Sequence, residues 1–271
     1  MFPLYDLNPH RRFPWVTLLL IAANVVILAA EGLEPSVNTV YRFGFIPKRV
    51  SELDSGKPLV VLVPQQDPRA RGRNPLAPTP VELSTAPADV YLTFFTTMFL
   101  HGNWLHLVMN MWMLWVFGNN IEDRLGRFMF ICYYLLGGLV GTVCQWASDP
   151  LSTMPVIGAS GAVATVLGGY AITYPKALVK TLIFFGLILI IDLPALVVLG
   201  IWFLLQMAAA GLKMLPGVPG EHVAFWAHIG GFLAGIALMP IFGLGAAPAE
   251  SDWKREVQEL FHFDDPRSRV E

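Results

Sequence analysis

Residues 158–174 have the sequence GASGAVATVLGGYAITY, an uncharged stretch made largely of small residues. Small residues make a helix a poor lipid-facing surface, but they allow neighbouring helix backbones to approach closely. We therefore expect Ser160–Tyr174 to form a short helix at the centre of a helical bundle. Ser160, Ala164 and Gly168 are spaced four residues apart, so they share one face of that helix.

The composition places this helix in a membrane rather than in a soluble domain. Of the 271 residues, 55% are hydrophobic and 14% are charged, whereas about 25% are charged in an average soluble domain. The mean hydropathy of +0.55 excludes a disordered chain. The Lys and Arg residues are scattered and form no basic stripe, so no nucleic-acid partner is expected. Cys132 and Cys144 lack CxxC spacing, and we interpret them as packing residues.

Five further apolar segments approach the roughly 20 residues that a spanning helix needs. They are Pro14–Ala30, Asn103–Gly118, Phe128–Ala147, Pro194–Leu212 and Val223–Phe242. A cleaved signal peptide is the alternative interpretation of the first segment, because basic residues precede it and small residues follow it. Between Lys180 and Asp192 the uncharged run covers only Thr181–Ile191, which favours an interfacial or re-entrant segment over a span.

The predicted fold class is therefore an all-α polytopic membrane protein with six transmembrane helices. We expect a cytoplasmic N-terminal segment at residues 1–13 and a membrane domain at 14–246. That domain carries a polar first-loop insertion at about 50–90, and a charged cytoplasmic tail follows at 247–271. Short-loop Lys and Arg residues fall on one side of this arrangement, with only Lys213 on the other, so the positive-inside rule puts both termini in the cytoplasm.

Polar side chains within the predicted spans mark the candidate functional site, because such residues are costly in a bilayer. Three sets of residues qualify: His101, His106 and Asn110 near the start of the second span, Ser160 at the start of the central helix, and His228 in the last span. His101 precedes Asn103, the predicted N-cap of its helix. Metal binding is the alternative for the histidines, but there is no HExxH motif and no carboxylate nearby in sequence.

Ser160 and His228 are the candidate nucleophile and general base. In the six-helix arrangement their helices run in the same direction, and each residue lies toward the outer end of its helix. Small-residue faces on both helices permit the close approach that a hydrogen bond from Ser Oγ to an imidazole requires. No acidic residue lies near His228 in its helix, so we expect a dyad. His106 and Asn110 are expected to donate hydrogen bonds to a developing oxyanion.

Four motifs, taken in order, resemble those of the rhomboid intramembrane serine proteases. They are residues 101–110 (HGNWLHLVMN), 122–126 (EDRLG), 158–161 (GASG) and 227–231 (AHIGG). The resemblance covers roughly residues 94–235 and implies a six-helix rhomboid-like bundle whose short central helix carries the serine. It also implies hydrolysis of peptide bonds in or near transmembrane segments without a cofactor. The implied partners are single-span membrane protein substrates and the lipid bilayer, and the sequence indicates no oligomeric state.

The resemblance also implies roles for individual residues. Ser160 is the nucleophile, His228 is the general base, and the oxyanion and substrate-binding residues are His106, Asn110, His101 and Gly158. Glu122 and Arg124 match a pair that braces a cytoplasmic loop in the family, although a solvated turn explains them equally well.

The chain departs from the family where some members have an aromatic residue that stacks on the histidine. Ala164 occupies that position, so either Tyr170 or Phe225 orients the ring instead, or the ring is less constrained in this chain. The segment Trp202–Leu204 is the expected lateral gate, and a lipid-facing surface is the alternative interpretation.

Two other classes of function stay open. A catalytically silent rhomboid-like binding or quality-control factor would use the same scaffold, but proteins of that kind lose the serine or the histidine, and both are present here. A transporter would show paired inverted repeats, and no repeat is visible. Because no organelle-targeting presequence is apparent, we expect a bacterial type of rhomboid in the bacterial inner (cytoplasmic) membrane.

Overall fold

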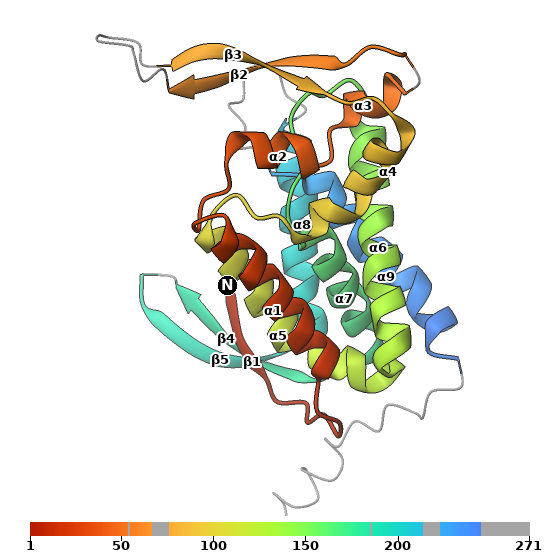
Figure 1. Ribbon diagram of the computed structural model, residues 1–271. Helices are drawn as coiled ribbons and strands as arrows, with labels where there is room; N and C mark the ends of the chain where they lie inside the picture. Colours follow the sequence, from red (N-terminus) through yellow and green to blue (C-terminus); the bar gives the residue numbers. More distant parts are fainter. Residues whose placement is uncertain (54, 67–75, 185, 214–222, 245–271) are drawn as a thin grey trace, which may run out of the picture.

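The computed structural model describes residues 1–53, 55–66, 76–184, 186–213 and 223–244. Its centre is a bundle of helices that lie side by side (Figure 1). They are α1 (Trp15–Ala30), α5 (Trp104–Leu125), α6 (Arg127–Ser148), α7 (Ser160–Thr173), α8 (Ala195–Lys213) and α9 (Phe225–Phe242). Helix α7 contacts α5, α6, α8 and α9, and its residues 161–171 are all buried.

Three helices in the described part of the chain, α6, α8 and α9, are long and apolar enough to cross a bilayer. Helices α1 and α7 are shorter and apolar. Helix α5 extends beyond the predicted span and ends in the polar segment Glu122–Leu125. The structure is thus helical with three candidate spans, and the six-span arrangement stays a prediction.

Close backbone contact between α7 and α9 explains the glycines on their facing surfaces. A Cβ atom at Gly231 would collide with the carbonyl oxygen of Gly161, and a Cβ atom at Gly168 would collide with that of Phe232. Glycine at these positions lets the two helices approach until their backbones touch. The Thr165 hydroxyl donates a hydrogen bond to the Gly231 carbonyl across the same contact, at 3.0 Å.

Glu122 joins α5 to the start of α1. Its carboxylate accepts hydrogen bonds from the Val16 and Thr17 backbone N–H groups at 3.0 and 2.7 Å, and from the Thr17 hydroxyl at 2.8 Å. A helix N-terminus has free N–H donors, so a buried carboxylate there stabilises it. Glu122 is only 3% exposed, and the alternative interpretation of this residue as part of a solvated turn is therefore wrong.

The expectation of an all-α fold is wrong at both ends of the bundle. The first loop forms α2 (Val37–Phe43), α3 (Pro47–Ser51), the antiparallel strands β2 (Leu59–Gln66) and β3 (Leu76–Leu83), then α4 (Pro87–Thr96) and a short 3₁₀ helix (Thr97–Phe99). Tyr41 and Ile46 pack with apolar residues of the two strands in a small second core. Residues 67–75 of the predicted insertion and the predicted tail at 247–271 lie outside the described residues.

A second sheet lies at the opposite end of the bundle, with the strand order β1–β4–β5 (Figure 1). Strand β1 (Phe2–Asp6) comes from the predicted N-terminal segment, and β4 (Leu178–Phe184) and β5 (Ile188–Pro194) form a hairpin. The segment predicted to be interfacial or re-entrant is thus two strands. The physical reason is that β-branched and aromatic residues together make up most of a run too short for a spanning helix, and Gly186 has the positive φ of 76° that the tight turn requires.

Candidate active site

Ser160 and His228 are in direct contact at one end of the bundle. Ser160 is the first residue of α7, and His228 lies in the first turn of α9. The distance between Ser160 Oγ and His228 Nε2 is 2.7 Å. The close contact between the backbones of α7 and α9 places these two residues, 68 positions apart in sequence, within hydrogen-bond distance. This is the distance that a serine nucleophile and its general base require.

The other ring nitrogen of His228 faces Gln206 on α8. His228 Nδ1 lies 2.8 Å from Gln206 Oε1. A carbonyl oxygen only accepts, so this contact puts the proton on Nδ1 and leaves Nε2 free to take the proton of the serine hydroxyl. Sequence reasoning missed Gln206. The signal was present, because Gln206 is the only polar side chain between Ala195 and Leu212.

Two aromatic rings hold the imidazole in place. The rings of Phe225 and His228 are nearly perpendicular, with their centroids 6.2 Å apart, and the Trp202 ring lies 6.0 Å from His228 with an interplanar angle of 34°. Phe225 was one of two candidates for this role. The other candidate, Tyr170, lies near the far end of α7 and packs against Phe117, so that expectation is wrong.

The predicted oxyanion residues gather around the loop that precedes Ser160. A Cβ atom at Gly158 would lie 2.8 Å from His106 Nε2 and 3.7 Å from Asn110 Nδ2, so both polar side chains lie against this glycine. Gly158 has φ of 122°, which a residue with a side chain rarely adopts. Asn103 accepts a hydrogen bond from the His106 N–H at 2.8 Å, which confirms the predicted N-cap of α5.

His101 supports the same loop from behind. Its Nε2 accepts a hydrogen bond from the Ala159 N–H at 3.5 Å, and its ring meets that of His106 edge-on at 5.1 Å. His101 is buried. All six predicted site residues thus lie in or beside the contact between the Gly158–Ser160 loop, α5 and α9. The described residues contain no group of three or more His, Cys, Asp or Glu side chains that could hold a metal ion.

A pocket of about 340 Å³ lies at the start of α9, and its lining includes Phe225, whose ring contacts that of His228. Neither Ser160 nor His228 lines this pocket. Its lining comes from the end of α6, the loop before α7, the start of α9, Pro47 of α3 and Ala210 of α8. Gln145, in the same lining, accepts a hydrogen bond from the Ala227 N–H at 3.3 Å and so anchors the first turn of α9.

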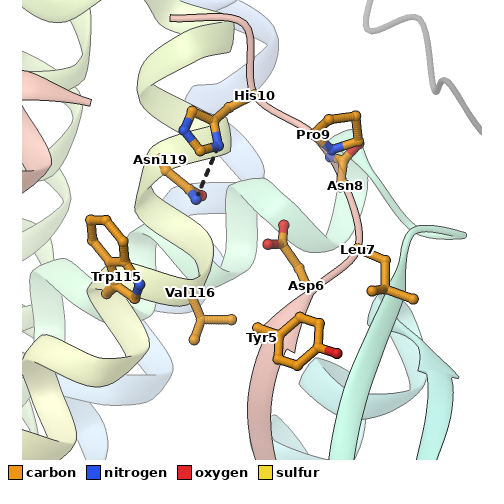
Figure 2. A pocket seen from close by; sticks show the side chains of 9 residues that line it. All are labelled: Tyr5, Asp6, Leu7, Asn8, Pro9, His10, Trp115, Val116 and Asn119. Carbon is orange, nitrogen blue, oxygen red and sulfur yellow. Dashed lines mark hydrogen bonds between the residues drawn. The ribbon is translucent and has the colours of Figure 1, made fainter. Parts of the chain in front are cut away.

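A separate polar cluster lies at the other end of α7, around the pocket shown in Figure 2. Asp6 Oδ2 accepts hydrogen bonds from the Tyr170 hydroxyl at 2.7 Å and from Asn120 Nδ2 at 2.6 Å. Asn119 lies 3.4 Å from His10 in the same lining, as the dashed line marks (Figure 2). Burial raises the pKa of Asp6 to about 7. These contacts tie β1 to α5 and α7, far from the Ser–His pair.

The fold and the site together define a class: a helical membrane protein whose apolar helices hold a half-buried Ser–His pair beside an amide and a second imidazole. Residues 88–244 match the Rhomboid domain family, and the chain belongs to that family.

Curated relatives share the same family name. The chain is 34% identical over 88 residues to presenilin-associated rhomboid-like protein A, mitochondrial, of Danio rerio, a match that covers 32% of this chain and 23% of that protein. It is 32% identical over 148 residues to rhomboid-like protein 11, chloroplastic, of Arabidopsis thaliana, covering 54% and 50%. It is 30% identical over 175 residues to rhomboid-like protease 3 of Toxoplasma gondii, covering 63% and 60%.

The chain therefore spans less than two thirds of each of these relatives. Two of them are named as mitochondrial or chloroplastic, so they do not support the predicted bacterial type or the bacterial inner membrane. Family membership and the apolar helices indicate an integral membrane protein.

Proposed function

We propose that this protein is an intramembrane serine endopeptidase that hydrolyses peptide bonds in or near the transmembrane segments of other membrane proteins. The observation that carries the proposal is the 2.7 Å contact between Ser160 Oγ and His228 Nε2 within a bundle of apolar helices. A serine hydroxyl is a weak nucleophile until a base accepts its proton, and a neutral imidazole with a free Nε2 is such a base.

In the acylation step, Ser160 Oγ attacks the scissile carbonyl carbon while its proton moves to His228 Nε2. Gln206 Oε1 stabilises the positive charge that develops on the imidazolium, because it accepts a hydrogen bond from the Nδ1–H group of His228. When the tetrahedral intermediate collapses, His228 gives the proton to the leaving amine and an acyl-serine remains. Water then attacks the acyl-serine with His228 again as the base. This step regenerates the Ser160 hydroxyl and releases the carboxylate product.

The negative charge on the tetrahedral oxygen needs donors that are in place before the reaction. His106 and Asn110 lie against Gly158, two residues before the nucleophile, and supply side-chain donors. The first turn of α7 supplies backbone N–H groups, because no side chain in the described residues caps this helix N-terminus. The helix dipole favours a negative charge at the same end.

The substrate class follows from the surroundings of the site. A peptide bond within a membrane helix is already hydrogen-bonded, so single-span substrates with helix-breaking residues near the cut are the preferred partners. The proposed topology has six spans with both termini in the cytoplasm and the Ser–His pair toward the outer leaflet. In the proposed gate at Trp202–Leu204, the Trp202 ring contacts His228, whereas Leu204 is exposed on the outside of α8.

The test is cleavage of a tagged single-span substrate by the purified protein in proteoliposomes. Ser160→Ala and His228→Ala are each expected to abolish product, because one removes the nucleophile and the other removes the base. Ser55→Ala and His10→Ala, which change the same residue types outside the site, are the matched controls and are expected to cleave like the unchanged protein. Cleavage that persists in Ser160→Ala would contradict the proposal, and a folded unchanged protein that never cleaves would favour a catalytically silent factor.

A further inference from the structure

The hairpin formed by β4 and β5 extends away from the helices (Figure 1). It follows the C-terminal end of α7, whereas Ser160 is the first residue of that helix, so the base of the hairpin and the Ser–His pair lie at opposite ends of α7. Its base is packed, because Val179 and Thr181 on β4 are fully buried. Toward the turn the packing stops. Phe184 and Ile188, which face each other across the hairpin, are 70% and 68% exposed.

Both faces of this distal part are apolar. Phe184, Ile188 and Ile190 lie on one face, and Leu189 and Ile191 on the other, and all of them are exposed. Strand β5 is also an edge strand, since the sheet order is β1–β4–β5. Soluble proteins protect such an edge with charges or prolines, because a bare apolar edge aggregates in water. Residues 188–191 carry neither, so another apolar phase covers them.

The charges on the hairpin indicate what that phase is. Lys180 and Asp192 face each other near the base and form an ion pair at 2.7 Å. Beyond this pair the described residues of both strands are uncharged up to the turn. A polar base and an apolar tip match the gradient from headgroups to acyl chains in a bilayer, where apolar side chains enter the acyl boundary and charged groups stay hydrated.

The apolar surface of the hairpin is also continuous with that of a candidate span. Strand β5 ends at Pro194 and α8 begins at Ala195, where Leu196 and Val197 are again exposed. On the other side of the sheet, Trp112 of α5 donates a hydrogen bond from Nε1 to the Pro3 carbonyl of β1, at 2.8 Å. Tryptophan side chains, which combine an apolar ring with a polar N–H group, are typical of the membrane–water interface.

From these observations we infer that the β4–β5 hairpin is a membrane-surface element whose apolar side chains enter the lipid of the leaflet opposite the Ser–His pair. The outer edge of β5 has no strand partner among the described residues. Unpaired backbone groups are not tolerated in the hydrocarbon core, so the hairpin does not cross it: the apolar tip enters only the acyl boundary with both faces, and the charged base stays among the headgroups. The inference holds whether or not the Ser–His pair hydrolyses peptides.

The experiment is spin-label accessibility in liposomes of phosphatidylcholine and phosphatidylglycerol. A nitroxide is attached to Ile190→Cys, and in a second variant to Leu189→Cys on the other face, after Cys132 and Cys144 are replaced by serine. Collisions with oxygen, which concentrates in lipid, are compared with collisions with a water-soluble nickel complex. Leu204→Cys on α8 is the lipid reference, and Lys57→Cys in the first loop is the aqueous reference.

At both hairpin positions we expect oxygen collisions to exceed nickel collisions several-fold, as at Leu204. Nickel accessibility equal to that at Lys57 would overturn the inference, because the hairpin would then lie in water. Low accessibility to both reagents, together with dipolar broadening between labels, would also overturn it, since a second copy of the chain would then cover β5.

Discussion

Replacing Gln206 with methionine removes the hydrogen-bond acceptor of His228 Nδ1 while keeping an unbranched side chain of similar size. Without that acceptor, the Nδ1–H loses its partner at 2.8 Å, and the ring is free to place its proton on Nε2, where it cannot serve as a base toward Ser160. A hydrogen bond to a group that becomes charged contributes about 1.5–3 kcal/mol. At about 1.4 kcal/mol per tenfold in rate, kcat should fall about 10- to 100-fold.

The assay is steady-state cleavage of a single-span substrate in proteoliposomes, with kcat and KM measured separately. KM should stay unchanged, because in the proposed mechanism Gln206 touches the base and not the substrate. Gln206→Glu keeps an acceptor oxygen and should recover most of the lost kcat, whereas a packing role would not distinguish methionine from glutamate in this way. Met207→Leu changes the neighbouring exposed position and serves as the control. An undiminished kcat in Gln206→Met would refute the orienting role.

Three further outcomes follow from the contacts that hold the fold. Gly231→Ala puts a methyl group against a carbonyl of α7 and should lower both the melting temperature in detergent and fluorophosphonate labelling. Gly200→Ala, with open space around its Cβ position, should leave both unchanged. Glu122→Ala removes three buried hydrogen bonds at the α1 N-terminus and should destabilise the protein by about 2–4 kcal/mol in reversible unfolding, well beyond Asp123→Ala. Because burial raises the pKa of Asp6 from 3.8 to about 7, its folded form binds the proton more tightly, so stability should fall as pH rises between these values. Thermal unfolding across this range should show that slope, and Asp6→Asn should remove it.

Residue spacing made the proximity of Ser160 and His228 predictable. Small residues at intervals of four on two helices indicate close backbone contact, and that contact is present at Gly168 and Gly231. The 2.7 Å distance agrees with this expectation, while the catalytic roles of the two residues stay predictions.

Contacts between distant helices were harder to predict. Gln206 belongs to no motif, and only its isolated polarity within α8 marks it. Phe225 could be proposed as a partner of His228 because it lies one turn away on the same helix. Tyr170 was a poor candidate for a physical reason: ten residues along α7 amount to roughly 15 Å, which places it near the other end of the helix.

The strands were missed because the hydropathy of a short apolar run does not distinguish a strand from a helix. In residues 178–194, two strands pair with each other in a hairpin, and β4 also pairs with β1 near the start of the chain, a contact that sequence spacing does not reveal. Glu122 illustrates the same difficulty. Within EDRLG it resembles a surface turn, and its burial depends on the N-terminus of α1, more than a hundred positions away.

The central claim is that Ser160 is a nucleophile activated by His228. The most direct measurement is reaction of the purified protein with a fluorophosphonate, followed by peptide mass spectrometry to locate the adduct. We predict a single adduct on Ser160 in the unchanged protein and none in His228→Ala at the same reagent concentration and time. An adduct on a different serine, or equal labelling of Ser160 without the imidazole, would contradict the account.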